Sequence, residues 1–146
     1  MLQQLAAAAL AAAVSLPAVA QQAKPEDQIK QRRSALAVIG YNFSSLAAMA
    51  QEKKPYAKDE AARNAQLVAA LAEYPRQFFG EGTDKGETKA RPELWQKRAD
   101  FDAKWDKMIA EARRLPQAAG EPGTLKKAVA DTGAACKACH DDYRAK

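Results

Sequence analysis

The chain has 146 residues and a formal net charge of +5, from 23 Lys and Arg against 18 Asp and Glu. The basic residues are spread along the sequence, with no run of five and no interleaving with aromatic residues, so nothing indicates a nucleic-acid-binding site. A modestly basic surface suits solubility and docking to acidic partners.

The first twenty residues, MLQQLAAAALAAAVSLPAVA, contain no charged side chain and are predicted to be a signal peptide. An apolar run from Leu5 to Leu16 is followed by Pro17 and by an Ala-Val-Ala cleavage pattern that ends at Ala20. The run is shorter than the roughly 20 apolar residues that span a bilayer. Because no Lys or Arg precedes it, an uncleaved anchor or a buried Ala-rich helix is the alternative. We expect cleavage after Ala20, a periplasmic protein without stable membrane association, and one mature domain over residues 21–146.

After Gln21, four Ala-rich stretches are separated by Pro and Gly, and their apolar residues recur at intervals of three, four or seven. This spacing predicts helices over about 25–52, 58–78, 92–115 and 124–144. Pro75 is expected to kink or end the second helix, and Pro116 to end the third. The connection FFGEGTDKGETKARP contains three glycines and is predicted to be a long loop with a function or with mobility.

No stretch shows the period-two pattern of a strand, and four amphipathic helices suffice to bury one core. The predicted fold class is therefore all-α, an antiparallel up-down-up-down four-helix bundle.

The sequence CKACH, near the end of the last predicted helix, holds both cysteines and the only histidine of the chain, Cys136, Cys139 and His140. Residues at i, i+3 and i+4 share one face of a helix, so these three side chains point the same way. A redox disulfide would prefer a helix N-terminus, and this motif lies at a C-terminal end. A structural zinc ion needs four ligands, and the neighbouring carboxylates are poorly aimed. The C-x-x-C-H signature favours the third interpretation, covalent attachment of one heme c.

The far side of the iron would then need a second ligand or remain open. No second histidine exists, Met108 fits the core pattern of the third helix, and Met49 would lie about 20 Å along the first helix from the level of His140. Leu36, with Phe79, is left to cover that face. An apolar cover predicts five-coordinate, high-spin iron that admits small diatomic gases, although Leu36 could equally be an ordinary core residue.

Three segments resemble cytochrome c-prime, the class II bacterial c-type cytochromes: KPEDQIKQRRSAL, FFGEGTDKGETKARPELW and GAACKACHDDYR. The resemblance covers essentially all of residues 23–146. It implies an antiparallel four-helix bundle, commonly a homodimer through the first two helices, with covalent heme and an open distal site that binds NO and CO.

By this resemblance, Cys136 and Cys139 are the thioether positions and His140 is the axial iron ligand. Arg32 matches an arginine near a heme propionate, where its guanidinium suits a carboxylate; the alternative is a solvated surface arginine. Arg33 stands where the family often has glutamine, and it is a further candidate for heme contact.

Other matches lie in the loop and at the end of the chain. Thr88 and Lys89 fall in the region that touches the heme edge. Arg144 matches a basic residue beside the proximal pocket, and a cation at a helix C-terminus would look the same. Arg76 departs from the bulky apolar residue expected over the heme, and it either changes pocket polarity or points outward.

We expect a periplasmic heme c protein that binds NO and CO, exchanges electrons with redox partner proteins, and buffers or removes nitric oxide. No acid-base pair or Ser/His arrangement supports an enzyme. The alternative within heme proteins is a low-spin electron carrier whose sixth site is closed by a side chain; a small metal or thiol module is the alternative outside them.

Overall fold

A computed structural model describes residues 23–146, and the expected signal peptide lies outside that range. The elements are α1 (Pro25–Ala50), α2 (Lys58–Leu71), the 3-10 helix η1 (Tyr74–Phe78), α3 (Glu93–Gln96), α4 (Arg98–Ala112), α5 (Leu115–Ala118) and α6 (Pro122–Tyr143). Within residues 23–146 there is no strand, only an isolated antiparallel bridge between Ala90 and Arg144. The predicted all-α class is confirmed. None of the described helices is long and apolar enough to cross a membrane.

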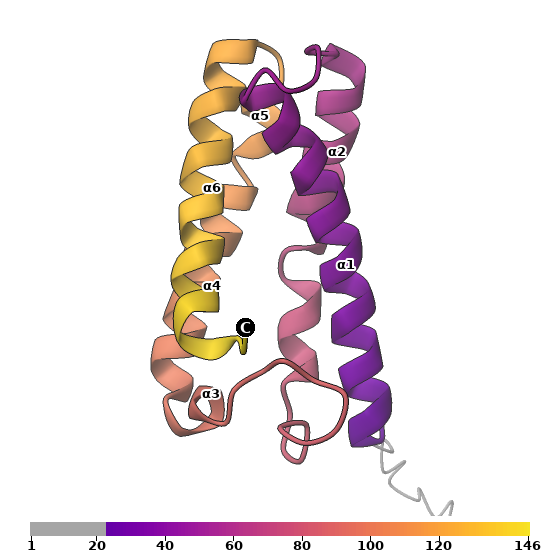
Figure 1. Ribbon diagram of the computed structural model, residues 1–146, viewed down its shortest axis with the longest axis vertical. Helices are drawn as coiled ribbons and strands as arrows, with labels where there is room; N and C mark the ends of the chain where they lie inside the picture. The colour runs from indigo at the N-terminus through magenta and orange to yellow at the C-terminus, as the bar shows by residue number, and fades with distance from the viewer. Residues whose placement is uncertain (1–22) are drawn as a thin grey trace, which may run out of the picture.

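The four long helices α1, α2, α4 and α6 run up, down, up and down, as predicted (Figure 1). α1 packs against α2 and α6, and α4 packs against α6. Pro25 starts α1 because its missing N–H is not needed in the first turn, and Glu26 and Asp27 behind it suit the positive end of the helix dipole.

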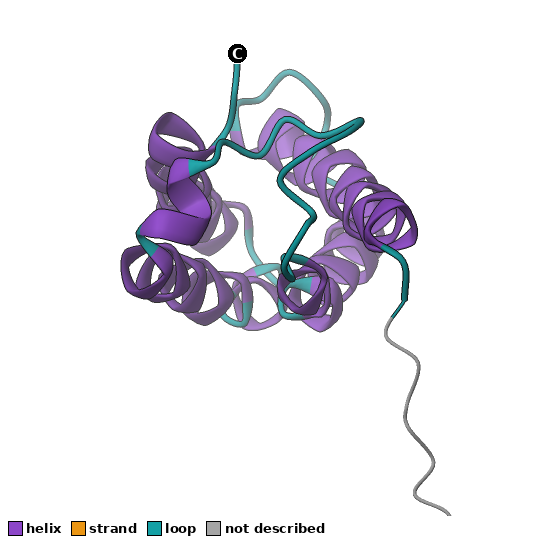
Figure 2. Cartoon of the chain, turned by 90° about the horizontal axis from the view of Figure 1, so that it is seen from below, coloured by secondary structure: helices purple, strands orange, loops and turns teal. Residues whose placement is uncertain are grey.

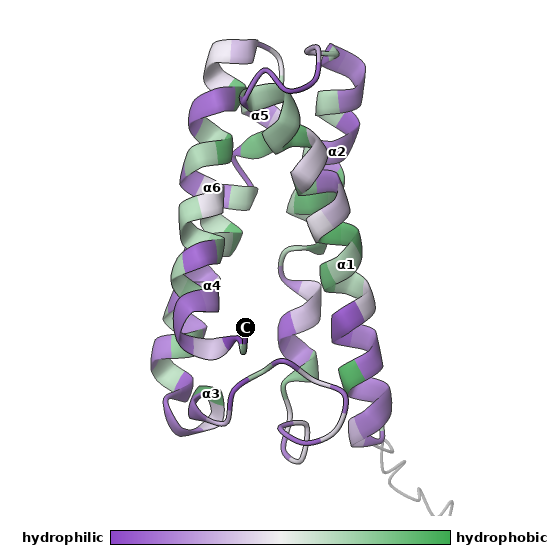
Figure 3. Ribbon diagram, in the orientation of Figure 1, coloured by the Kyte–Doolittle hydropathy of each residue, from purple (hydrophilic) through white to green (hydrophobic). Residues whose placement is uncertain are grey.

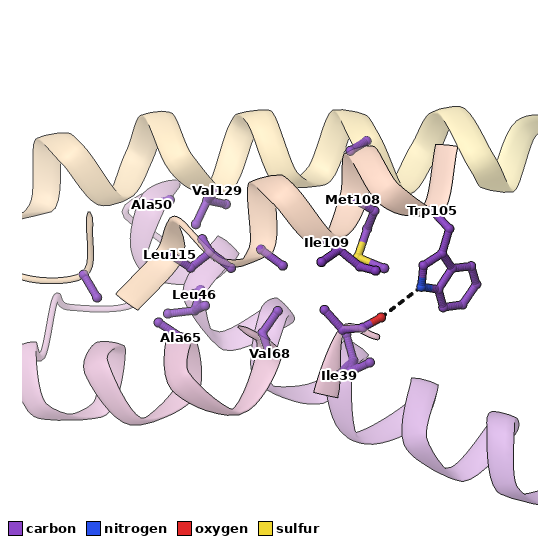
Figure 4. Packing of buried hydrophobic residues seen from close by; sticks show 14 of the residues in the cluster. Ile39, Leu46, Ala50, Ala65, Val68, Trp105, Met108, Ile109, Leu115 and Val129 are labelled. Atoms are coloured by element: carbon purple, nitrogen blue, oxygen red, sulfur yellow. Dashed lines mark hydrogen bonds between the residues drawn. The ribbon is translucent and has the colours of Figure 1, made fainter. Parts of the chain in front are cut away.

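The core lies where all four long helices meet, and Figure 4 shows the side chains of Leu46, Val68, Ile109 and Val129 together there. Trp105 is also buried, and its indole N–H donates a 3.0 Å hydrogen bond to the carbonyl of Ala72. The apolar residues of α1 gather in its C-terminal half, whereas its N-terminal half is mostly hydrophilic (Figure 3). The dense aliphatic core therefore occupies the end of the bundle remote from CKACH.

Two helix boundaries differ from the predictions. The stretch 92–115 is interrupted at Lys97, whose φ of −114° and ψ of 44° separate α3 from α4. On either side of the interruption, Trp95 and Arg98 donate 3.0 Å hydrogen bonds to carbonyls of the preceding loop. Pro116 does not end a helix, since it occupies the first turn of α5, where proline is tolerated. The prediction for Pro75 is right in kind, because α2 ends at Leu71 and Pro75 lies in η1.

The predicted long loop crosses the end of the bundle at which α6 finishes (Figure 2). The amide of Arg91 donates to the carbonyl of Tyr143 at 2.9 Å, and the amide of Ala145 donates to the carbonyl of Lys89 at 2.8 Å. The loop, which begins after η1, is thus hydrogen-bonded to the residues at the end of α6.

Glu111 is a buried carboxylate on α4, with 4% of its side chain exposed. It accepts hydrogen bonds from Lys107 at 2.5 Å and from Arg114 at 2.8 Å. The hydrogen bond from Lys107, followed by weaker effects that include the charge of Arg114, lowers the pKa of Glu111. The ionised form therefore stabilises the folded state above the unfolded pKa of Glu, and this stabilisation disappears as the pH falls through the folded pKa.

Glu111→Gln should accordingly reduce the fall in Tm between pH 7 and pH 3, because the variant has no carboxylate to protonate at this position. Thermal unfolding followed by circular dichroism measures the effect. Glu87→Gln is the matched control, since the Glu87 side chain is 90% exposed and pairs only with Arg33 at the surface. An equal fall in Tm for the Glu111 variant and the unmodified protein would contradict the assignment.

Candidate heme site

The last two turns of α6 carry Cys136, Cys139 and His140. Both cysteines are free and half-buried, and they pack against the core cluster. Burial raises the pKa of Cys136 and raises that of Cys139 to about 11, so both are thiols near neutral pH. Partial burial, with a smaller contribution from the charge of Arg144, lowers the pKa of His140 and favours the neutral imidazole that ligates metals.

The register between α1 and α6 is set where the ring of Phe43 packs on Gly133; a Cβ added to that glycine would lie 3.6 Å from the ring. Leu36 lies seven residues before Phe43, and His140 lies seven residues after Gly133. In antiparallel helices these steps move about 10 Å in the same direction and return to nearly the same face. Leu36 of α1 is therefore level with His140 of α6, at the end where the two ribbons lie far apart (Figure 1).

Arg32, one turn before Leu36, is almost completely buried, with 2% of the residue exposed. Its guanidinium donates to the carbonyls of Phe78 and Thr83 at 2.9 and 2.7 Å and to the hydroxyl of Thr88 at 2.7 Å. The alternative of a solvated surface arginine is wrong. Burial lowers the pKa of Arg32 to about 10, which leaves the side chain cationic at pH 7. Among residues 23–146 no carboxylate forms an ion pair with it, although a buried cation is most stable beside an anion.

Phe79 lies below the guanidinium of Arg32, which is 4.5 Å from the ring centroid. Its ring also contacts Phe101, Trp105 and Trp95, with centroid distances of 5.1, 5.5 and 6.4 Å. This aromatic cluster connects the first residue after η1 with α3 and α4. Trp95 and Trp105 are thus packing residues.

The remaining predicted residues lie nearer the surface. Arg33 forms an exposed pair with Glu87, with the side-chain nitrogen 2.9 Å from the carboxylate. Thr88 is half-buried beside Arg32, whereas Lys89 and Arg144 are exposed. The structure therefore brings Arg32, Thr88 and Phe79 together, and leaves Arg33, Lys89 and Arg144 around the rim.

Two open questions about other side chains are answered by their positions. Arg76 pairs with Asp106 of α4 at 2.5 Å, so it points toward the outside of the bundle. Met49 is buried near the C-terminal end of α1, and Met108 is buried in the core (Figure 4). Both thioethers belong to the hydrophobic cluster.

Sequence reasoning missed residues whose burial or hydrogen bonds depend on tertiary contacts. Thr83 is fully buried in the loop, and its carbonyl accepts from Arg32. Asp100 accepts a hydrogen bond from the hydroxyl of Tyr143, which lies one turn beyond His140. No local pattern marks Thr83 or Asp100, although Tyr143 continues the apolar rhythm of α6.

The residues fit heme c by the chemistry of the donor set. Two thiols at i and i+3 and the adjacent imidazole share one helix face, as C-x-x-C-H attachment requires. Arg32, a buried arginine that pairs with no carboxylate of residues 23–146, lies at the same end of the bundle and can bind a propionate. In the described part of the chain no group of three or more His, Cys, Asp or Glu side chains is placed to hold a metal ion.

Arg32→Met should lower the free energy of unfolding by about 3 kcal/mol, because hydrogen bonds to a buried charge are lost and the carbonyls of Phe78 and Thr83 are left without a donor. Urea denaturation of the purified protein measures the change. Arg33→Met, on the same helix turn, should cost less than about 1 kcal/mol, since its ion pair with Glu87 is exposed. Equal losses of unfolding free energy in the two variants would show that the hydrogen bonds of Arg32 do not account for the destabilisation.

Comparisons with known proteins identify the family of this chain. The family model of Cytochrome C' matches residues 27–144. The chain is 45% identical over 127 residues to cytochrome c' of Rubrivivax gelatinosus, covering 84% of this chain and 98% of the relative. It is 34% identical over 139 residues to cytochrome c-554 of Cereibacter sphaeroides, covering 91% of each.

Solved structures show the same relationship. The crystal structure of the Rubrivivax gelatinosus cytochrome c' matches with a TM-score of 0.82 at 43% identity, covering 86% of this chain and 100% of that one. The nitric oxide complex of a leucine-to-isoleucine variant of cytochrome c prime from Alcaligenes xylosoxidans matches with a TM-score of 0.78 at 36% identity, covering 85% and 98%. The chain therefore belongs to the cytochrome c' family of heme c proteins.

Proposed function

We propose that this chain is a periplasmic heme c protein that binds nitric oxide and carbon monoxide and exchanges electrons, buffering or removing nitric oxide. One observation carries the proposal: the residue level with His140 across the bundle is Leu36, which has no atom able to bind iron. Two variants of one relative, cytochrome c prime from Alcaligenes xylosoxidans, were solved as nitric oxide complexes, which supports the choice of gas.

Cys136 and Cys139 attach the heme, and His140 ligates the iron on the α6 side. The bound heme supplies an iron that takes up a diatomic ligand and changes oxidation state. On the α1 side, Leu36 excludes water and anions because its side chain offers no hydrogen bond, while a small neutral gas can still enter. Phe79 forms part of the surrounding apolar wall from the end of η1.

The polar residues hold the rest of the group. The buried guanidinium of Arg32 gives a propionate a cationic partner, with the hydroxyl of Thr88 beside it. Arg33 and Lys89 would lie near the heme edge; both are exposed, and the charge of Lys89 suits docking of acidic redox partners, whereas Arg33 is paired with Glu87. Arg144 contributes positive charge on the proximal side, near His140.

The competing function is a low-spin electron carrier with a side chain in the sixth site. It would need Met49, Met108 or a lysine to reach the iron. Both methionines are buried in the core cluster, and Met49 lies near the opposite end of α1 from Leu36. The chain aligns with the relative named cytochrome c-554 over 139 residues and with the cytochrome c' of Rubrivivax gelatinosus over 127, so the absorption spectrum must decide between these functions.

Absorption spectra of the purified protein, ferric and then ferrous, with and without CO, separate the two functions. A broad high-spin ferrous Soret band that sharpens with CO is expected if Leu36 screens an open site. Leu36→Ala should accelerate CO association at least several-fold because the screen is smaller, whereas Val38→Ala, an exposed residue of the same helix, should leave it unchanged. Split α and β bands unmoved by CO would establish the electron carrier instead.

The wider proposal includes export and pairing of two copies. Export follows from the signal-peptide pattern that ends at Ala20. Pairing is supported by exposed Val38 and Tyr41 on α1 and exposed Leu67 on α2, with 44%, 80% and 44% of their surfaces accessible. An apolar surface on two neighbouring helices suits a symmetric contact with a second copy.

Intact mass spectrometry of the protein from a bacterial periplasm tests these points together. Under denaturing conditions the mass should equal residues 21–146 plus one heme, because thioether bonds survive unfolding. Under native conditions twice that mass is expected. A chain that retains residues 1–20 would refute cleavage, and a native mass of one copy would refute the dimer.

A further inference from the structure

The last turn of α6 is fastened to α4 by four side chains, Asp100 and Lys104 from α4 and Asp142 and Tyr143 from α6. We refer to them as the α4–α6 clamp. None of them belongs to the set that attaches or covers the heme. The clamp lies close to the attachment residues. Asp142 and Tyr143 are two and three residues after His140, in the last turn of α6.

Lys104 is the centre of the clamp. Its ammonium group is 2.7 Å from the carboxylate of Asp100, one turn earlier on the same helix, and 2.6 Å from that of Asp142 on the facing helix. Only 26% of its side chain is exposed, and hydrogen bonding to the two carboxylates raises its pKa. Lys104 is also close enough to Cys139 for its charge to oppose the burial that raises the pKa of that thiol. The ammonium group therefore joins the two helices beside the attachment site.

Tyr143 is the second anchor and has 4% of its surface exposed. Its hydroxyl donates to Asp100, and its ring packs edge-on against Phe101 with centroids 5.6 Å apart. The ammonium of Lys104 lies 5.5 Å from the ring centroid. The backbone carbonyl of Tyr143 accepts a hydrogen bond from the amide of Arg91 at 2.9 Å. The ring, hydroxyl and carbonyl of one residue are thus all fixed by other elements.

The position of these anchors matters because α6 ends at Tyr143. The amide of Arg144 donates to the carbonyl of His140 at 3.1 Å, so His140 sits in the last hydrogen-bonded turn. Terminal turns of helices are the first parts to open, since fewer hydrogen bonds hold them. A histidine in such a turn keeps one orientation only if the residues after it are held.

We propose that Asp100, Lys104 and Tyr143 are positioning residues for His140: by clamping the end of α6 to α4, they fix the imidazole in the orientation in which it ligates iron. This inference rests on the proposed function, in which His140 is the axial ligand. The clamp acts through the backbone of α6 and makes no contact with a gas ligand.

Tyr143→Phe and Lys104→Met test the proposal in the holoprotein. The first keeps the ring packing and removes the hydrogen bond to Asp100; the second removes both ion pairs of Lys104. Each should accelerate deuterium exchange in the C-terminal peptide 140–146 roughly tenfold, as expected when one hydrogen bond to a charged group is lost. Each should also shift the iron–histidine stretching band in the resonance Raman spectrum of the ferrous protein.

Two further variants serve as rescue and control. Lys104→Arg can still bridge two carboxylates and should return the exchange rate and the Raman band toward those of the unmodified protein. Lys127→Met removes a similar ion pair on α6, 2.6 Å from Asp131 and remote from His140, and should change neither measurement.

The outcomes separate this inference from the proposed function. Covalent heme with an unchanged iron–histidine band in both clamp variants would overturn the positioning role alone. Faster exchange along the whole of α6 without a band shift would likewise show a purely structural role. Unmodified protein that carries no covalent heme by pyridine hemochrome would overturn the proposed function, and this inference with it.

Discussion

The site depends on the register of α1 against α6, which is set where Phe43 packs on Gly133. The ring of Phe43 lies beside Gly133 at ordinary van der Waals distance, and along α1 this contact lies between Leu46 of the aliphatic core and Leu36. From this point Leu36 comes level with His140, and Arg32 lies one further turn toward the loop. A shift of one residue in this packing would rotate Leu36 and Arg32 away from the site.

Two cations are held in different ways on the two sides of the site. Arg32, on the α1 side, donates only to neutral oxygens of η1 and the loop among the described residues, and it keeps its full charge for an anion that they do not provide. Lys104, on the α6 side, is neutralised by Asp100 and Asp142 and serves to join helices. Burial alone therefore does not show whether a cationic side chain binds a ligand or joins two helices. The charge of the groups that contact the side chain distinguishes these two roles.

The sequence predicted the long helices and the attachment motif because both depend on local spacing. Helical periodicity located α1, α2, α4 and α6, and C-x-x-C-H carries its chemistry within one turn. The interruption at Lys97 could not be predicted, since it accompanies hydrogen bonds from Trp95 and Arg98 to a loop distant in sequence. For the same reason the burial of Arg32 and the bond from Tyr143 to Asp100 were not apparent from the residues themselves.

The pairing of residues 89–91 with 143–145 also has a consequence for the order in which the described elements can assemble. The loop that receives Arg32 is held both by the residues that follow α6 and by Arg32 of α1, which are distant from it along the chain. Contacts between segments that are distant in the chain require the closure of long loops, and their entropic cost must be met before they stabilise the fold. The end of the bundle that carries CKACH is therefore expected to order after the aliphatic core at the other end.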